Sequence, residues 1–384
     1  MHILIAPQSL KGSLSAAETG AAIAQGVRNV FPTATITSIP IADGGEGTVQ
    51  ALIDATHGEL RSQIVTGPAG EAVEAQYGLL GDGQGAVIEM AASSGLPLLR
   101  PAQRNPLTTT TYGVGELIKA ALDQGRRHFI LGIGGSATND GGAGMAQALG
   151  ADLLDQQGQS LPFGGAALAQ LDRISIEKMD SRLQACHFEI ACDVNNPLCG
   201  PSGASAIYGP QKGATPEMVA ELDAALAHYA SIIQRDLQRS VANIPGAGAA
   251  GGLGAGTLAF LNAELRPGAR IILEALQLDE YMKNADLVIT AEGRLDEQTA
   301  YGKSVGAIAA LAKKHGLPVL ALAGGLGKDY KGIYDLGIDG LMVLPSEPMS
   351  LVYAIEHAAP LMSEATERAL QLFRMGLQYK GRLI

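Results

Sequence analysis

The sequence predicts an α/β protein of two domains, in which a large second α/β domain is inserted into a domain built on a parallel sheet. Its 384 residues exceed the roughly 250 to 300 residues that one hydrophobic core usually organises. Short apolar runs alternate with amphipathic helical patterns at both ends of the chain, which is typical of a parallel sheet covered by helices. The pattern changes between these ends, which places the boundaries near residues 60 and 282. The outer domain would comprise residues 1–60 and 283–384, and the inserted domain residues 61–282.

The strands and helices of the outer domain follow from apolar runs and helix-start signals. Residues 2–6 form a short apolar strand, and the capping box Ser15-Ala-Ala-Glu18 begins a helical pattern that reaches about Phe31. The other predicted elements repeat this order: a strand over 35–42, a helix from the glycine-rich string 43–48 to about His57, a strand over 285–291, a helix over 303–314 and a strand over 318–323. Both ends of the chain are therefore predicted to supply strands to one parallel sheet.

The inserted domain is predicted to mix strands and helices around two glycine-rich segments. Its elements are a hairpin-type region over 64–80, strands over 87–90, 128–133 and 188–192, and helices over 113–124, from 142 to about 149 and over 216–241. Residues 134–142 form a glycine-rich loop after a strand. Residues 245–256 show no periodicity and are predicted to be a glycine-rich connection.

Composition favours a soluble enzyme over several other classes of protein. Fifty glycines beside six Phe and no Trp are typical of a loop-rich α/β enzyme rather than a binding module with large aromatic anchors. With 27 basic and 38 acidic side chains, the formal charge of −11 repels a nucleic-acid backbone. No signal peptide is recognised and no segment offers about 18 uninterrupted apolar residues, so a cytoplasmic protein without membrane contact is expected.

The cysteines and histidines show no pattern of a disulfide or metal site. Cys186, Cys192 and Cys199 are odd in number and lack C-x-x-C spacing, so they are interpreted as reduced thiols. The histidines, His128 and His187 among them, lack metal-ligand spacing and are interpreted as surface or packing residues.

Polar residues gather just past the predicted strands. In open α/β sheets, ligands bind outside the carboxyl ends of the strands, where loops carry the polar groups. The candidates in the outer domain are Ser9, Lys11, Ser13, Asp43, Gly44, Gly45, Glu46, Glu292, Arg294, Asp296, Gly324 and Gly325, and those in the inserted domain are Gly134, Gly135, Ser136, Thr138, Asn139, Asp140, Asp193 and Asn195. Glycine loops that bind phosphate, basic side chains that neutralise it and carboxylates that hold Mg²⁺ or accept a proton together indicate phosphoryl transfer.

Three short segments match known functional motifs only in part. Gly302-Lys303-Ser304 resembles the end of a phosphate-binding P-loop, but Glu297 stands where the first glycine is needed. Residues 302–306 match the G-x-S-x-G elbow of serine hydrolases, yet the nearest predicted strand ends about ten residues earlier. Residues 132–137 fit the loose dinucleotide pattern but lack an acidic residue at the end of a second strand. An NAD-dependent oxidoreductase of a small hydroxy acid is therefore kept only as an alternative.

Five longer strings resemble one known family over essentially the whole chain. They are PQSLKGSLSA (7–16), ADGGEGT (42–48), GIGGSATNDGGAG (132–144), DVNNPLCGP (193–201) and TAEGRLDEQTAYGKS (290–304). In order and spacing they resemble the bacterial glycerate kinase family of glyoxylate and sugar-acid catabolism. The first string commonly reads PDSFKGSLSA in that family, so Gln8 and Leu10 replace an Asp and a Phe, and the charge of that Asp is missing here.

The resemblance implies Mg²⁺-dependent transfer of the γ-phosphoryl group of ATP to D-glycerate, with 2-phosphoglycerate favoured over 3-phosphoglycerate as the product. It also implies a Rossmann-like domain that contains a large insertion. Because polar clusters occur on both the outer segments and the insertion, the active site is expected in the interdomain cleft. A non-catalytic sugar-acid-binding protein is the alternative from a different class, and the oligomeric state stays open, a homodimer included.

Expected roles follow from the chemistry of each side chain in this setting. Lys11 would contact the donor phosphates or the substrate carboxylate, and Asp193 would act as general base on the glycerate hydroxyl. Glu292, Arg294 and Asp296 alternate, so an extended segment would place two acids and a guanidinium on one side to hold Mg²⁺ and a carboxylate. The loop residues would bind phosphate, Mg²⁺ or glycerate: Asp43, Glu46, Ser136, Thr138, Asn139 and Asp140. The structural alternative for each is a solvated or turn-capping side chain.

Overall fold

The chain forms two compact units in a computed structural model that describes residues 1–10, 12–41, 47–295 and 304–379. Unit 1 comprises Met1–Asp43 and Ile272–Ile384, and unit 2 comprises Gly44–Ile271. Both divisions come earlier in the chain than the predicted boundaries near residues 60 and 282. The first difference has a packing cause, because helix α2 (Thr48–Thr56) lies against strands β3, β4 and β5 of unit 2. The second division falls within helix α9 (Gly268–Ala275).

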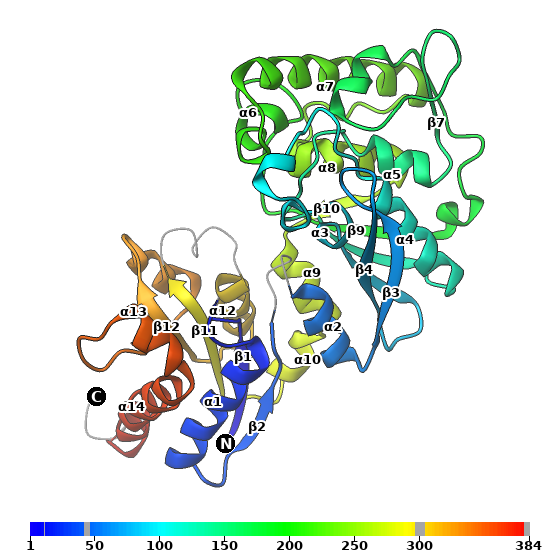
Figure 1. Cartoon of the computed structure of the whole chain (residues 1–384). Coiled ribbons are helices and arrows are strands. Elements are labelled where there is room, and N and C mark those ends of the chain that lie inside the picture. Colours follow the sequence, from blue (N-terminus) through cyan, green and yellow to red (C-terminus); the bar gives the residue numbers. More distant parts are fainter. Residues whose placement is uncertain (11, 42–46, 296–303, 380–384) are drawn as a thin grey trace. The chain divides into compact units, whose positions relative to one another are not determined.

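Unit 1 is built on a five-stranded sheet with the order β13-β12-β11-β1-β2, in which every neighbouring pair is parallel. Its strands are β1 (His2–Pro7), β2 (Thr35–Ser38), β11 (Leu287–Leu295), β12 (Val319–Leu326) and β13 (Gly340–Val343). Strands from the two ends of the chain lie side by side in Figure 1, where blue β1 adjoins yellow β11. The prediction that both ends share one parallel sheet is therefore confirmed.

Helices cover both faces of this sheet. The helices of unit 1 are α1 (Ala16–Val30), α10 (Leu278–Met282), α12 (Ser304–Lys314), α13 (Leu351–Glu356) and α14 (Ala358–Tyr379), and of these α1, α12 and α14 contact the strands of the sheet. Ile5 and Ile289 share a core with Ile23 of α1 and Met362 of α14. Leu4 points to the opposite face by the alternation of strand side chains and is also fully buried, so that face is covered as well.

The capping box predicted at Ser15 is present at the start of α1. The Glu18 backbone N donates to Ser15 Oγ at 3.2 Å, and the Ser15 backbone N donates to Glu18 Oε2 at 2.8 Å. These bonds satisfy backbone donors that a helix start leaves without intrahelical partners. Farther along, α1 packs closely on α14, because a Cβ at Gly26 would lie 2.4 Å from the Ser363 carbonyl oxygen.

Unit 2 is built on a six-stranded mixed sheet with the order β10-β9-β6-β5-β4-β3. Its strands are β3 (Glu59–Thr66), β4 (Ala72–Leu79), β5 (Gly85–Glu89), β6 (His128–Gly132), β9 (His187–Ala191) and β10 (Glu264–Arg266). Strands β5, β6, β9 and β10 run parallel, whereas β3 and β4 form the predicted antiparallel hairpin. A separate antiparallel pair joins β7 (Asp152–Leu154) and β8 (Arg173–Ser175).

Among the described residues, two hydrophobic cores lie in unit 2. The first joins the sheet to helix α4, with Phe129 of β6, Phe188 of β9 and Leu117 of α4 among its members. The second surrounds helix α7, from which it takes Leu226 and Tyr229. The helices of this unit besides α2 and α9 are α3 (Ala91–Ser94), α4 (Tyr112–Asp123), α5 (Ala143–Ala148), α6 (Ala204–Tyr208), α7 (Pro216–Leu237) and α8 (Ala249–Phe260).

The glycine-rich segment 245–256 differs from the prediction. Left-handed backbone angles at Ala250, Gly251 and Gly252 interrupt helix α8, so only residues 253–256 of the segment belong to its regular helical run. The prediction of a glycine-rich connection was wrong only for residues 253–256, which begin a helix that is buried on nearly all sides. A helix that is buried all round has no polar face and therefore no amphipathic periodicity in its sequence.

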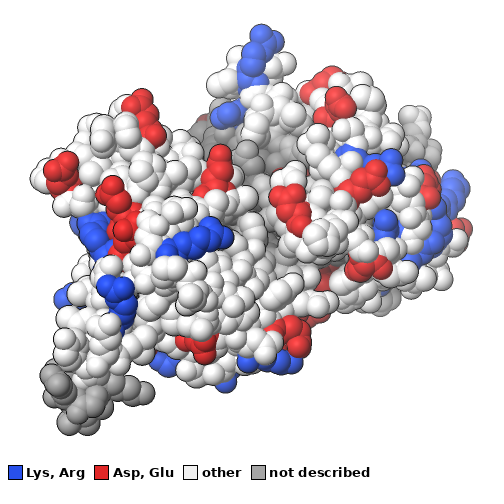
Figure 2. Space-filling model, turned by 90° about the horizontal axis from the view of Figure 1, so that it is seen from below, with Lys and Arg blue, Asp and Glu red and all other residues white. Residues whose placement is uncertain are grey.

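Surface and cysteine features agree with the composition. On the face drawn in Figure 2, basic and acidic side chains are interspersed rather than gathered by sign. Cys186, Cys192 and Cys199 are free thiols, as predicted. None of the described helices combines the length and apolar character that crossing a membrane requires.

Candidate active site

The loop after β6 lies at the carboxyl end of a central parallel strand of unit 2. Its backbone is exposed at Gly134 and Gly135, and Gly135 has a φ of +72°, a left-handed conformation that favours glycine. The side chains that follow are buried: Ser136 is 6% exposed, Thr138 and Asn139 are 0% exposed, and Asp140 is 1% exposed. The turn at Gly134 and Gly135 is therefore the part of this loop that a ligand can reach.

The buried carboxylate of Asp140 stabilises the loop through hydrogen bonds. Its carboxylate accepts hydrogen bonds from the backbone N and the hydroxyl of Thr111, both at 2.8 Å, and from the backbone N atoms of Gly142 at 3.1 Å and Gly144 at 3.2 Å. Burial raises the pKa of Asp140, and the four hydrogen bonds act in the opposite direction. The predicted ligand-binding side chain thus connects the loop to helix α5 and to the start of α4.

A lysine that the sequence analysis did not single out supports the same loop. Lys212, in the short 3-10 helix Pro210–Lys212, is 1% exposed, and its Nζ donates to Ser136 Oγ at 2.6 Å and to the Thr138 carbonyl at 2.7 Å. Burial lowers the pKa of Lys212 to about 7, while the nearby charge of Asp140 acts against this shift. Lys212 follows no strand, so a search of strand ends does not find it.

Helix α8 packs against the back of the loop through backbone atoms. The Gly141 N donates to the Gly251 carbonyl at 3.0 Å. A Cβ at Gly251 would lie only 1.9 Å from the Thr138 carbonyl oxygen, which explains why glycine stands there. The Asn139 Nδ2 also donates to Ser205 Oγ of α6 at 2.9 Å. The loop is therefore fixed by α4, α6 and α8 together, an arrangement that preorganises its exposed turn.

Asp193 and Asn195 follow β9 and are both exposed. The Asp193 Oδ1 accepts a hydrogen bond at 2.9 Å from the backbone N of Gly268, the first residue of α9. This contact caps the helix start. The predicted role of Asp193 as general base stays a prediction.

In unit 1, the residues that were expected to follow two strands lie within them. Glu292 and Arg294 belong to β11, where they pair with Ala323 and Gly325 of β12. Gly324 and Gly325 likewise belong to β12 rather than to a loop after it. The predicted strand ends were wrong because β11 and β12 continue to pair beyond their apolar stretches. The extended conformation expected at this segment is present, so Glu292 and Arg294 share a face of the sheet, the first half-buried and the second exposed.

The loop after β1 carries Gln8, Ser9 and Ser13. Gln8 is 6% exposed, its backbone N donates to the Ala291 carbonyl at 2.9 Å, and its Nε2 has no hydrogen-bond partner among the described residues. Ser9 is half-buried, and Ser13 Oγ donates to the Ile355 carbonyl at 2.9 Å. An amide that stands in the family's aspartate position is therefore buried beside β11.

Several predicted site residues lie outside the described residues. They are Lys11, Asp43, Gly44, Gly45, Glu46 and Asp296. Their predicted roles stay predictions. Within unit 2 the structure brings together Ser136, Thr138, Asn139 and Asp140, and within unit 1 it brings Glu292 and Arg294 beside Gly324 and Gly325.

Parallel strands with glycine turns and polar side chains at their carboxyl ends are the arrangement in which α/β proteins generally bind small polar ligands. The model of the glycerate kinase family matches residues 3–374, and the chain belongs to that family. This membership implies a kinase.

Proteins with similar sequences align with this chain over nearly its whole length. A Haemophilus influenzae protein named glycerate kinase is 55% identical over 341 residues, which cover 89% of this chain and 90% of the relative. An Escherichia coli K12 protein named glycerate 2-kinase is 49% identical over 381 residues, 99% of this chain and 100% of the relative. A crystal structure from Salmonella typhimurium LT2, described as a glycerate kinase 2, superposes with a TM-score of 0.91 at 50% identity and covers 98% of this chain and 99% of that one.

Proposed function

We propose that this protein is a cytoplasmic glycerate kinase that transfers the γ-phosphoryl group of ATP to D-glycerate and forms 2-phosphoglycerate and ADP. The observation that carries the proposal is the similarity to relatives named glycerate kinase, which reaches 49% identity over 99% of the chain. The site chemistry supports it, because phosphoryl transfer depends on positioned donors and on charge neutralisation rather than on a covalent nucleophile.

The turn at Gly134 and Gly135 is proposed to bind phosphate or carboxylate oxygens through its backbone. It is the exposed part of a loop whose side chains are buried and whose backbone is held by Lys212 and Gly251. A rigid turn loses little conformational entropy when a ligand binds. Lys212 and Asp140 are proposed to position this turn without contacting the substrate.

Arg294 is proposed to bind an anionic group of the substrate or nucleotide. Its side chain is exposed and stands opposite Gly325, where a methyl group added to the glycine would meet no atom of the described residues within 4 Å. A guanidinium binds carboxylate and phosphate through paired N–H donors. Lys11 is proposed to supply a second positive charge, and Asp193 to accept the proton of the glycerate hydroxyl.

Mg²⁺ is proposed to be held by Glu292 and Asp296. The donor set fits this ion, because Mg²⁺ prefers carboxylate oxygens together with phosphate oxygens and water. Glu292 is half-buried on β11, a strand whose carboxyl end forms the candidate site of unit 1. When bound, the ion would supply positive charge to the phosphate oxygens during transfer.

An assay of the purified protein tests the activity, the metal and the product. ADP release from ATP and D-glycerate should require Mg²⁺, stop in excess EDTA and return when Mg²⁺ is restored. Enolase added alone should convert the product to phosphoenolpyruvate, since enolase acts on 2-phosphoglycerate and not on 3-phosphoglycerate. Absence of turnover would favour a non-catalytic binding protein, equal turnover in EDTA would reject the metal, and a product inert to enolase would reject the assigned hydroxyl.

Substitution of Asp296 tests the proposed carboxylate. Asp296→Asn keeps the volume of the side chain and removes its charge. Loss of a positioned acid–base group typically lowers a rate by about 10² to 10⁴, so kcat should fall by at least about a hundredfold. The melting temperature should stay near that of the parent protein. Parent-like turnover would remove Asp296 from the site, and a collapsed melting temperature would assign it a structural role.

A further inference from the structure

Two histidines and a glutamate meet at the amino ends of strands β6 and β9 in unit 2. The ligating atoms of His128, His187 and Glu189 all lie within 4.8 Å of one another. His128 Nε2 is 2.8 Å from Glu189 Oε2, and the two imidazole rings have their centroids 5.3 Å apart. His187 is exposed, His128 is half-buried and Glu189 is 7% exposed, so the cluster opens to solvent on one side.

We propose that His128, His187 and Glu189 form a binding site for a divalent transition-metal ion, with Zn²⁺ as the best match. Imidazole nitrogens and one carboxylate are ligands that Zn²⁺ accepts, whereas Mg²⁺ prefers oxygen ligands alone. Ligand atoms about 2.0 to 2.1 Å from a tetrahedral ion lie about 3.3 Å apart. The distances between 2.8 and 4.8 Å in the cluster bracket that spacing, so small side-chain rotations suffice.

The strand pairing fixes the relative positions of the three side chains. His128 is the register partner of His187 in the parallel pair of β6 and β9, and Glu189 follows two positions later on the same face of β9. On the opposite face, Phe129 and Phe188 stack with centroids 4.6 Å apart, inside the first core of unit 2. The ligand set is thus mounted on paired strands instead of a loop, which favours a site that is formed before the ion binds.

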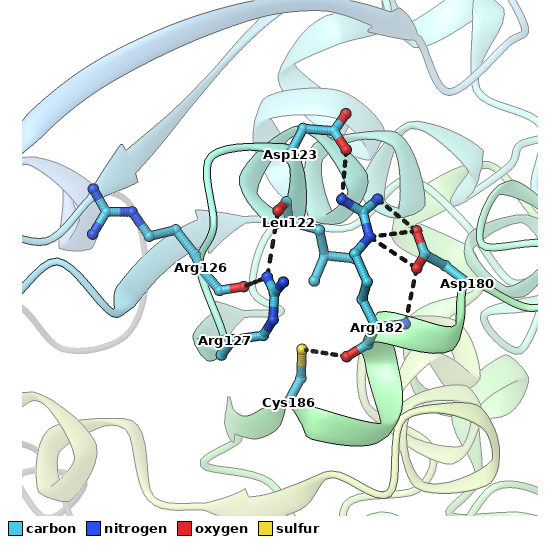
Figure 3. A network of polar contacts seen from close by, with 7 residues as sticks. All are labelled: Leu122, Asp123, Arg126, Arg127, Asp180, Arg182 and Cys186. Carbon is cyan, nitrogen blue, oxygen red and sulfur yellow. Dashed lines mark hydrogen bonds and ion pairs between the residues drawn. The ribbon is translucent and has the colours of Figure 1, made fainter.

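The start of β9 is anchored by the polar network that Figure 3 shows. The guanidinium of Arg182 forms two ion pairs: Nη1 lies 2.8 Å from Oδ1 of Asp123, the last residue of α4, and Nη2 lies 2.6 Å from Oδ2 of Asp180. The Cys186 thiol donates a hydrogen bond to the Arg182 carbonyl at 3.2 Å. One residue later, the His187 backbone N donates to the Arg127 carbonyl at 2.8 Å. These contacts hold the backbone of His187 beside that of His128.

Arg266 of β10 orients the carboxylate. Its Nη1 pairs with Glu189 Oε1, which leaves Oε2 directed toward His128. A partner that holds one oxygen of a ligating carboxylate fixes the direction of the other, as outer-sphere groups do in metal sites. In this arrangement the ion would take the place of the hydrogen bond between His128 Nε2 and Glu189 Oε2.

The proposed site is separate from the candidate kinase site. The loop after β6 and Asp193 after β9 lie at the carboxyl ends of these strands, and the histidines begin the same strands. The first and last residues of this five-residue strand lie about 13 Å apart at about 3.3 Å per residue, so an ion here would not touch a substrate at the other end. The inference therefore does not rest on the proposed function.

Metal titration of the full-length protein tests the proposal. Protein freed of metal by chelator is titrated with Zn²⁺ by calorimetry, with Mg²⁺ present to occupy oxygen-rich sites. One Zn²⁺ per chain should bind, and the melting temperature should rise with Zn²⁺ because only the folded protein presents the site. His187→Asn and His128→Asn should each weaken binding by about tenfold or more. The control is His57→Asn, which changes an exposed histidine outside the cluster and tolerates the left-handed backbone there.

Each outcome decides the proposal. Lost binding in both cluster variants with retained binding in the control supports it, provided the metal-free variants melt like the parent protein. Parent-like affinity in the cluster variants, or no saturable Zn²⁺ binding in the parent, overturns it and leaves only an ion-pair network with Arg266. His187 is exposed, so its variant is expected to fold even if the His128 variant does not. Mg²⁺-dependent ADP release should stay at the parent level in the His187 variant.

Discussion

Lys212 has an unusual environment for a cation, because its two hydrogen-bond acceptors are neutral. Its Nζ is bonded to a hydroxyl and a carbonyl oxygen, while the side chain is 1% exposed. Burying a charge without a directly bonded opposite charge is costly, and the lowered pKa of about 7 expresses that cost. The lysine is therefore close to losing its proton near neutral pH.

This pKa predicts a pH-dependent contribution to stability. The value is about 10.5 for an ordinary lysine and about 7 in the folded protein, so the unfolded state binds more protons between these values. The contribution of Lys212 to the stability of the folded protein is therefore lowest below pH 7, where the buried side chain carries its charge. The free energy of unfolding should rise as pH increases from about 7 toward 10.5, by at most about 1.4 kcal/mol per pH unit. In Lys212→Met this rise should disappear.

Urea unfolding of both proteins at several pH values between 6.5 and 9.5 measures the effect. The difference in unfolding free energy between parent and Lys212→Met should grow with pH. Lys119→Met, which changes an exposed lysine, should run parallel to the parent. Parallel curves for Lys212→Met as well would show that the buried lysine does not titrate in this range.

The residues of the 134–142 loop show what a sequence can and cannot tell about a site. A glycine-rich loop was predicted over residues 134–142 after a strand, and the structure has a loop there after β6. Whether a side chain points to a ligand or into the protein depends on neighbours far away in sequence, such as Thr111 for Asp140 and Ser205 for Asn139. Those partners carry no local signal, so the inward orientation could not be predicted.

Among the elements, α8 is where composition misled prediction most. Its glycines allow its backbone to reach the backbone of another segment, and Gly251 is the closest case. A loop of the same composition and a buried helix are hard to tell apart, because neither has polar periodicity. By contrast, the amphipathic pattern predicted over 216–241 was found as α7 (Pro216–Leu237), with one face on the second core.

Gly251→Ala tests the contact between α8 and the loop. The alanine adds a left-handed backbone penalty of about 1 to 2 kcal/mol and a clash with the Thr138 carbonyl, which overpacking data place at about 1 to 3 kcal/mol. Gly125→Ala is the matched control, because Gly125 has a similar φ of +80° with no atom near the added Cβ.

The two variants separate the clash from the backbone penalty. Gly251→Ala should be less stable than Gly125→Ala in urea by about 1 kcal/mol or more, since only Gly251→Ala adds the clash. It should also slow ADP release because the Gly134 turn shifts, while Gly125→Ala keeps parent turnover. Equal losses of stability in the two variants would mean that the 134–142 loop moves away from the added methyl group without a loss of free energy.

For the whole molecule, the sequence predicted the parallel pairing of its two ends and the α/β class. Apolar strands buried on both faces, such as β1 and β11, give a strong local signal. The boundaries between the two units were predicted less accurately from the sequence. Helix α2 resembles any amphipathic helix in sequence, and only its packing on β4 and β5 assigns it to unit 2.

The position of β1 between β2 and β11 has a consequence for synthesis on the ribosome. β1 is made long before β11, and its register partners lie near residues 287–291. At about 5 to 20 residues per second, translation of the intervening chain takes roughly 15 to 55 seconds. By the end of that interval all the strands of unit 2 have been made, whereas β1 has had β2 on one side and an open edge on the other throughout. The segment made first thus completes its sheet last, and a nascent chain stalled before β11 exposes an apolar strand edge for chaperones or for aggregation.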